Sequence, residues 1–220
     1  PQGHLRRQSA QAHKADFVPV GKSKDKAFLL RHSPRVELVT GYGSQGSTRI
    51  NAFVLDNIEK LLRVAQVYHQ VGEANVVEVE GLSTSLTREL GEFSRSRYRM
   101  VGHFTVPELK VALAAANLVL SRAGAGAIFE VAAFGKPAIL VPLAESANGH
   151  QRANAYAYAE SGAAEVIEEG NFLPNVVLDR LSATLGNATT LEKMADAAKR
   201  FSRQNAAELI AREILALVGN

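Results

Sequence analysis

A turn of small residues near the middle of the chain could bind phosphate. Residues 121–126 read Ser-Arg-Ala-Gly-Ala-Gly and stand between an apolar segment and an amphipathic one. A small-residue turn that opens a helix leaves backbone N–H groups unpaired at the positive end of the helix dipole, which suits a diphosphate. Arg122 allows two interpretations, a contact to phosphate or a buried guanidinium that bonds nearby carbonyls. The candidate backbone contacts are Gly124, Ala125, Gly126 and Ala127.

Polar side chains after this turn could recognise hydroxyl groups. Glu130 comes six residues after Gly124, where its two oxygens could accept hydrogen bonds from both hydroxyls of a ribose. His150 and Asn154 share one face of an expected helix, with Gln151 beside them. Amide and imidazole groups bind neutral hydroxyls, so these residues suit a hexose. A core or capping hydrogen bond is an equal alternative for Asn154.

A second glycine-rich segment, residues 41–46, reads Gly-Tyr-Gly-Ser-Gln-Gly between an expected strand and an expected helix. This matches the dinucleotide fingerprint, which also needs a carboxylate about 20 residues on to hold the ribose. The chain has His69-Gln70-Val71-Gly72 at that place. An NAD-dependent oxidoreductase is therefore the weaker hypothesis. We interpret the loop as a phosphate cradle in which Ser44 faces anionic oxygen, with a ligand-free tight turn as the alternative.

Alternating strands and helices must position these loops. The pattern predicts strands at 36–40, 66–69, 98–101, 118–120, 138–142 and 164–167. Helices are expected at 48–62, 107–116, 127–134, 151–161, 174–185, 191–201 and 206–218, and an ambiguous helical stretch ends near residue 93. Such alternation predicts an α/β fold with a Rossmann-like, doubly wound parallel sheet. Ligands bind these sheets beyond the carboxyl ends of the strands, where the loops above lie.

The composition is that of a globular protein, with 46% hydrophobic and 21% charged residues among 220. There is no cysteine, which excludes disulfides and thiolate zinc sites. No segment approaches the roughly 18 apolar residues of a membrane-spanning helix. No pair of aspartates has D-x-D spacing in the loops described above, so we expect neither a metal nor another cofactor.

Residues 1–35 differ in charge from the rest of the chain. They hold eight Lys or Arg and two Asp, a charge of +6, which leaves −3 for the remainder and points to no nucleic-acid partner. An anionic membrane surface could attract this stretch with up to about 1 kcal/mol per cation, although a solvated arm explains the same charges. A predicted strand at 15–20 and a Lys-rich link indicate the end of a missing N-terminal domain at 1–35, followed by a ligand-binding domain at 36–220.

Five motifs in order resemble the C-terminal domain of the bacterial MurG family. They are Val-Thr-Gly-Tyr-Gly-Ser-Gln-Gly-Ser-Thr-Arg-Ile-Asn at 39–51, His69 to Gly72, Ser121 to Gly124 with Glu130, Gly135-Lys136-Pro137 with Val141-Pro142, and His150-Gln151 with Asn154-Ala155. That family moves N-acetylglucosamine from UDP-GlcNAc onto undecaprenyl-linked muramoyl-pentapeptide and so makes lipid II for peptidoglycan. The similarity covers about residues 36–218.

The resemblance implies the donor-binding, C-terminal half of a GT-B glycosyltransferase. It implies that Ser44, beside Gln45, binds phosphate and that the run from Ala125 to Glu130 binds diphosphate and ribose. Gln151 would hold the sugar hydroxyls, and uracil would lie against the backbone at Thr105 or Val106. The lipid-linked acceptor would bind through the missing domain. The enzyme would be cytoplasmic and peripheral, at the inner face of the cell membrane.

We expect inverting, metal-independent transfer, in which preorganised N–H groups stabilise the charge of the departing UDP. The general base should come from the missing domain, so this chain should bind UDP-GlcNAc but turn it over poorly or not at all. A protein of another functional class is the alternative. The chain could be a stand-alone UDP-sugar-binding module, or a subunit that a separate membrane partner completes.

Overall fold

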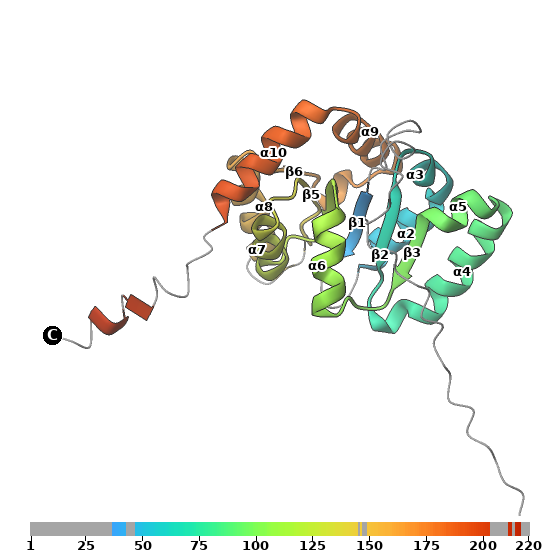
Figure 1. Ribbon diagram of the computed structural model, residues 1–220, viewed down its shortest axis with the longest axis horizontal. Coiled ribbons are helices and arrows are strands. Elements are labelled where there is room, and N and C mark those ends of the chain that lie inside the picture. The colour runs from blue at the N-terminus through green and yellow to red at the C-terminus, as the bar shows by residue number, and fades with distance from the viewer. Residues whose placement is uncertain are drawn as a thin grey trace, which may run out of the picture. The chain divides into compact units, whose positions relative to one another are not determined.

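The structure, a computed structural model, describes residues 37–42, 47–144, 146, 149–202, 211–212 and 214–216. A six-stranded sheet forms its centre, with all neighbouring strands parallel and the order β3-β2-β1-β4-β5-β6 (Figure 1). The strands are β1 (Glu37–Tyr42), β2 (Gln66–Gln70), β3 (Tyr98–Val101), β4 (Leu118–Ser121), β5 (Ala138–Leu140) and β6 (Ala164–Val166). Strand order reverses between β1 and β4, so the predicted doubly wound fold is confirmed.

Helices make the crossovers between the strands. After β1 come α2 (Thr48–Asp56) and α3 (Ile58–Val64), and after β2 come η1 (Glu73–Asn75), α4 (Val76–Glu89) and α5 (Glu92–Arg97). Single helices follow the next three strands: α6 (Val106–Ala115), α7 (Ala125–Ala133) and α8 (His150–Glu160). The last elements are η3 (Glu169–Asn171), α9 (Pro174–Leu185) and α10 (Ala188–Phe201).

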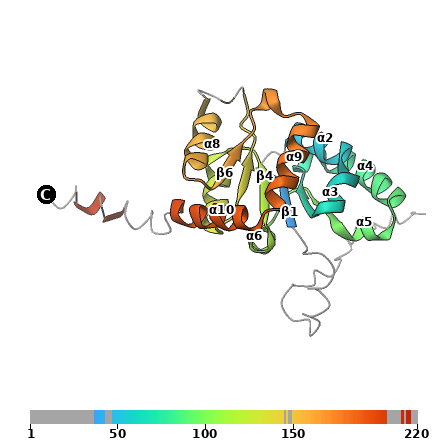
Figure 2. The ribbon, with the colours of Figure 1, turned by 90° about the horizontal axis from the view of Figure 1, so that it is seen from above.

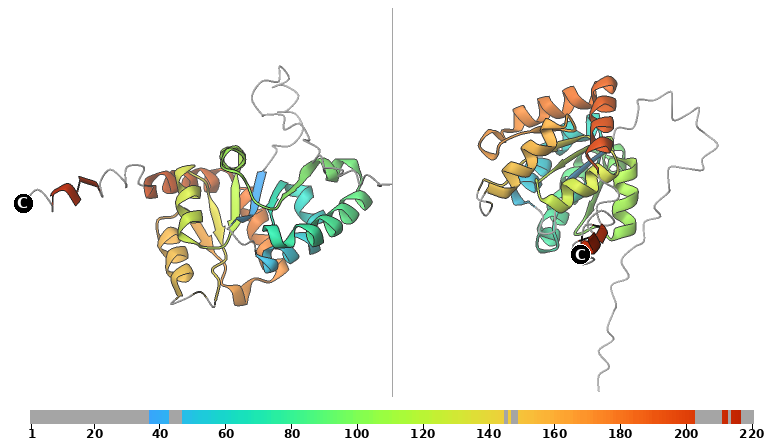
Figure 3. Two further views of the ribbon diagram at one scale, coloured as in Figure 1. Left: turned by 90° about the horizontal axis from the view of Figure 1, so that it is seen from below. Right: turned by 90° about the vertical axis from the view of Figure 1, so that its left-hand side faces the viewer.

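Two apolar cores lie on the two faces of the sheet. Neighbouring strand residues point to opposite faces, so Val39 belongs to one core and Leu38 to the other. The first core takes side chains from α6, α7, α8 and α10, and the second from α2, α3 and α9. Figure 2 shows α6 and α10 on one side of the strands and α3 and α9 on the other, and Figure 3 shows these layers from two more directions.

Several predicted helix boundaries are wrong, and side-chain hydrogen bonds explain two of the errors. The expected helix at 48–62 is divided because Asn57 bonds the Phe53 carbonyl with its side chain (2.9 Å) and leaves helical geometry. Helix α10 begins at Ala188 instead of 191 because the Asn187 side chain caps it, accepting from the Thr190 N–H (3.0 Å). Helix α7 begins at Ala125, two residues before the predicted start.

Some predictions fall on residues that the structure does not describe. The expected strand at 15–20, the whole stretch 1–35 and the loop residues Ser44 and Gln45 lie outside the described residues. Of the expected helix at 206–218, only 211–212 and 214–216 are described, and they are helical. Within the described part of the chain, no helix has both the length and the apolarity that crossing a bilayer requires.

Candidate functional site

The N-terminus of α7 is open at the carboxyl edge of the sheet, directly after β4. Its N-cap residue, Gly124, has no side chain to cap the helix, and the first turn holds no acidic residue. Ala125 and Gly126 are exposed, and a methyl group added at Gly124 or Gly126 would meet no atom of the described residues within 4 Å. The helix therefore presents first-turn N–H groups and its positive dipole end to solvent, as an anion requires.

The helices that follow β1 and β3 begin differently. Ser47 caps α2 by accepting from the Ile50 N–H (3.3 Å). A capping box closes α6, in which the Thr105 N–H donates to Glu108 (2.9 Å) while the Thr105 hydroxyl accepts from the Glu108 N–H (3.5 Å). The Thr105 hydroxyl also donates to the same Glu108 oxygen (2.7 Å), and this hydrogen bond, together with that from the Thr105 N–H, lowers the pKa of Glu108, whose negative charge lies at the start of α6. The start of α6 therefore carries a carboxylate and that of α7 carries none, which favours an anion at α7.

Glu130 lies on α7, exposed, five residues after the first residue of the helix. Its carboxylate makes no hydrogen bond or ion pair with any other residue that the structure describes. Partial burial raises the pKa of its carboxyl group, because no neighbouring cation offsets the loss of water. The carboxylate is therefore available as an acceptor for ligand hydroxyls, the role expected for it.

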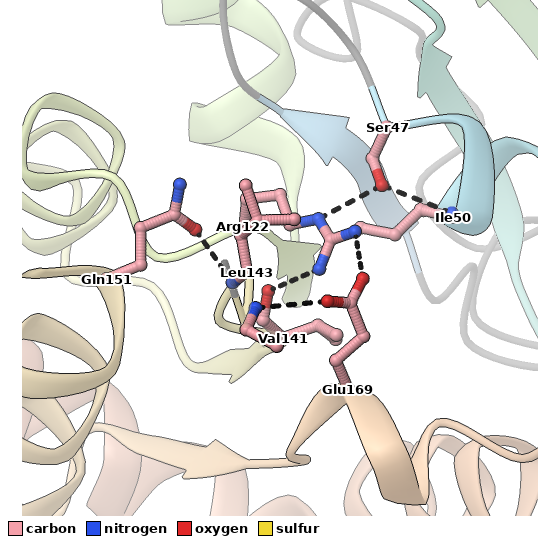
Figure 4. A network of polar contacts seen from close by, with 8 residues as sticks. Ser47, Ile50, Arg122, Val141, Leu143, Gln151 and Glu169 are labelled. Atoms are coloured by element: carbon pink, nitrogen blue, oxygen red, sulfur yellow. Dashed lines mark hydrogen bonds and ion pairs between the residues drawn. The ribbon is translucent and has the colours of Figure 1, made fainter. Parts of the chain in front are cut away.

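The three polar residues at the start of α8 have different surroundings. The Asn154 amide donates to the Ala123 carbonyl (3.3 Å), so the alternative of a structural hydrogen bond is confirmed for that residue. Gln151 accepts the Leu143 N–H with its Oε1 (3.1 Å), which leaves its Nε2 as a donor for a hydroxyl (Figure 4). His150 is exposed as the first residue of the helix.

Arg122 is a structural arginine, as the second interpretation proposed. Its Nη1 donates to the Val141 carbonyl (3.2 Å), its Nη2 to Glu169 (2.6 Å) and its Nε to the Ser47 hydroxyl (3.1 Å). Neither Ser47 nor Glu169 was among the predicted site residues. Ser47 precedes an expected helix start, which is a signal for a cap. Glu169 is 47 positions from Arg122 and carries no local signal.

A buried polar network occupies the place where a dinucleotide-binding fold would hold ribose. His69 bonds the Tyr98 hydroxyl through Nδ1 and Asn51 through Nε2, both at 2.9 Å. The Asn51 amide donates to the Val71 carbonyl (2.9 Å), so its oxygen accepts and His69 carries its proton on Nε2. Burial lowers the pKa of His69 to about 3, so the imidazole is neutral.

The loop after β3, where the resemblance puts uracil, is held from β2. The Gln70 side chain is fully buried, and its Oε1 accepts the Phe104 N–H (3.0 Å). Thr105 is the N-cap of α6, and its own N–H donates to Glu108. Val106, the first residue of the helix, is 67% exposed. Its place against uracil stays a prediction, as do the ligand contacts of every other site residue.

The chain is similar to known glycosyltransferases. Residues 37–210 match the glycosyltransferase family 28 C-terminal domain. Two proteins named UDP-N-acetylglucosamine--N-acetylmuramyl-(pentapeptide) pyrophosphoryl-undecaprenol N-acetylglucosamine transferase are similar. That of Bifidobacterium adolescentis is 32% identical over 188 residues, covering 82% of this chain and 47% of its own length. That of Corynebacterium efficiens is 35% identical over 178 residues, covering 79% and 44%.

A solved structure gives the same picture. The crystal structure of Acinetobacter baumannii MurG matches with a TM-score of 0.68 and 28% identity, over 84% of this chain and 50% of that one. The expected likeness to the C-terminal domain of the MurG family is confirmed, and the chain spans about half the length of the curated relatives it matches. Because the family match covers most of its residues, the chain belongs to the glycosyltransferase family 28 C-terminal domain family.

Proposed function

We propose that this chain is the donor-binding half of an N-acetylglucosaminyltransferase that takes UDP-N-acetylglucosamine and glycosylates undecaprenyl-linked muramoyl-pentapeptide. The names of the similar transferases support this donor and this acceptor. The observation that carries the proposal is the open, acid-free N-terminus of α7. Helices α2 and α6, in contrast, begin with a side-chain cap. A diphosphate finds both unpaired N–H donors and a favourable dipole at α7.

In the proposed complex, each part of the donor meets a different segment. The diphosphate accepts from the first-turn N–H groups of Ala125–Ala127. Glu130 accepts from the ribose hydroxyls, and the Nε2 of Gln151 donates to a hydroxyl of the sugar. Uracil lies against the backbone near Val106. Ser44 and Gln45 would add phosphate contacts from the glycine-rich loop.

The proposed chemistry is inverting transfer. An acceptor hydroxyl forms a bond to the anomeric carbon while the bond from that carbon to the diphosphate oxygen breaks, and a general base takes the hydroxyl proton. Negative charge grows on the departing UDP, and N–H dipoles that already point at it stabilise the transition state without reorganisation. We assign the general base and the acceptor contacts to polypeptide outside this chain.

The proposal also places the enzyme at a membrane. An acceptor with an undecaprenyl tail lies in a bilayer, so the transferase has to work at its surface, and we propose the cytoplasmic face of the cell membrane. The charge of +6 on residues 1–35 would favour an anionic surface.

Calorimetry tests the proposed donor site directly. We expect the 220-residue chain to bind UDP-GlcNAc and UDP, and not NAD. Glu130→Ala should weaken UDP binding by about 1–3 kcal/mol, because ribose hydroxyls would lose their acceptor. Glu160→Ala is the matched control, an exposed glutamate at the end of α8, and should leave the affinity unchanged. Binding of NAD in place of UDP would refute the proposed function, and an unchanged Glu130→Ala affinity would remove Glu130 from the site.

A further inference from the structure

A partly buried ion pair joins loops near the α7 N-terminus. The side chains of Arg122 and Glu169 are only 15% and 14% exposed, and Figure 4 shows the guanidinium between Ser47, Val141 and Glu169. Each of its three nitrogens donates to a protein oxygen, and its charge faces the carboxylate of Glu169. Three of its five N–H groups are thus used within the protein, and a carboxylate neutralises its charge.

Every partner of Arg122 belongs to a different segment at the carboxyl edge of the sheet. Ser47 is the N-cap of α2 and directly follows the glycine-rich loop. Val141 comes directly after β5. Glu169 uses its second oxygen to accept the Ala144 N–H (3.0 Å), in the segment between β5 and α8. The Arg122 guanidinium therefore links the start of α2 to the turn that precedes α7, and its ion pair with Glu169 links the segment after β5 to the same turn.

The turn itself is held at two successive residues. Arg122 is bound through its side chain, and the Ala123 carbonyl accepts from Asn154 of α8. Gly124 and the first turn of α7 follow directly. Contacts of the two residues that precede the helix thus set the direction of its first-turn N–H groups. A small change in the direction of these groups weakens their electrostatic interaction with a ligand strongly.

We propose that Arg122 and Glu169 are positioning residues for the diphosphate, which hold the α7 N-terminus in register with the start of α2 and with the segment after β5. They act through the backbone of these segments and touch no ligand. This inference rests on the proposed function, namely on UDP binding at α7.

Two variants test it in the 220-residue chain by calorimetry with UDP and UMP. Glu169→Gln keeps an acceptor for the Ala144 N–H but removes the charge, and Ser47→Ala removes the acceptor of the Arg122 Nε while the ion pair stays. Each should bind UDP about tenfold more weakly, with a smaller loss for UMP, which lacks the second phosphate. If Arg122 were itself a phosphate ligand, Glu169→Gln would free its charge and strengthen UDP binding, and that result would overturn the inference.

The control is Glu165→Gln, which makes the same change in the more exposed ion pair between Glu165 and Arg180 (3.5 Å) and should leave UDP binding unchanged. Thermal melts followed by circular dichroism ensure that affinities are compared on folded protein, and Ser47→Ala decides the matter if Glu169→Gln does not fold. Lower melting temperatures with unchanged UDP affinity would contradict the positioning role and leave the proposed function standing. A wild-type chain that binds no UDP would overturn both.

Discussion

At the scale of single residues, His69 shows how the fold turns a titratable group into a structural one. Its two ring nitrogens join Tyr98 of β3 to Asn51 of α2, and Asn51 passes the contact on to the backbone after β2. In the neutral tautomer Nε2 donates to the Asn51 oxygen and Nδ1 accepts from the Tyr98 hydroxyl, and only the second of these contacts needs an unprotonated Nδ1. Protonation would remove the acceptor at Nδ1 and place a charge in the core. The hydrogen-bond network therefore needs the neutral imidazole, and burial in the network keeps the imidazole neutral.

This dependence predicts a pH effect on stability. The pKa of His69 is about 3 in the folded protein and about 6.5 in the unfolded chain, so between these values the unfolded state binds the extra proton. The free energy of unfolding should therefore fall as the pH falls from 6.5, by up to about 1.4 kcal/mol per pH unit from this group. In urea titrations from pH 7 to pH 4, the free energy of unfolding should fall less steeply with falling pH for His69→Gln than for the wild type. The same pH dependence of the unfolding free energy in both proteins would mean that His69 is charged in the folded protein.

At the scale of elements, the helix beginnings decide which loop can take an anion. The capping box of α6 appears in the sequence as Thr-Val-Pro-Glu at 105–108, a local pattern. The open start of α7 is also local, since Gly124 and Ala125 carry no capping group. What makes the α7 start a positioned site is not local, because Asn154 reaches Ala123 over 31 residues.

A single substitution at this start should separate helix stability from ligand binding. Gly126→Asp puts a carboxylate in the uncapped first turn of α7, where a methyl group already has free space. The melting temperature should rise slightly, since the charge gains about 0.3–1 kcal/mol from the dipole and glycine is a poor helix former. UDP binding should be lost through repulsion. Gly126→Asn, of the same shape without charge, should retain most of it, and equal affinities for the two variants would argue against a diphosphate at α7.

At the scale of the whole molecule, the sequence was sufficient for the architecture but not for the contacts between segments. Alternating apolar runs and helical patterns predicted the parallel sheet, and the six strands predicted from residue 36 onward are all present. The divided helix at Asn57 and the ion pair of Arg122 with Glu169 were not predicted. A side chain that bonds its own backbone competes with helix formation in a way that periodicity does not record. A pair 47 positions apart forms only once the sheet has brought its segments together.

The centre of that sheet depends on one glycine. Gly41 of β1 has a φ of 74°, and a β-carbon there would lie 2.1 Å from the Gln70 carbonyl oxygen of β2. Gly41→Ala must therefore force the two central strands apart at the carboxyl edge, in addition to the strain of a left-handed backbone.

Gly91→Ala isolates the strain, because Gly91 has a φ of 85° but open space around its β-carbon position. In urea unfolding we expect a loss of about 1–2 kcal/mol for Gly91→Ala and at least about 3 kcal/mol for Gly41→Ala. Since a positive φ is common to both, the difference reports mainly the contact between β1 and β2. Equal losses would mean that the strands separate at no cost, and Gly41 would then be needed for its backbone conformation alone.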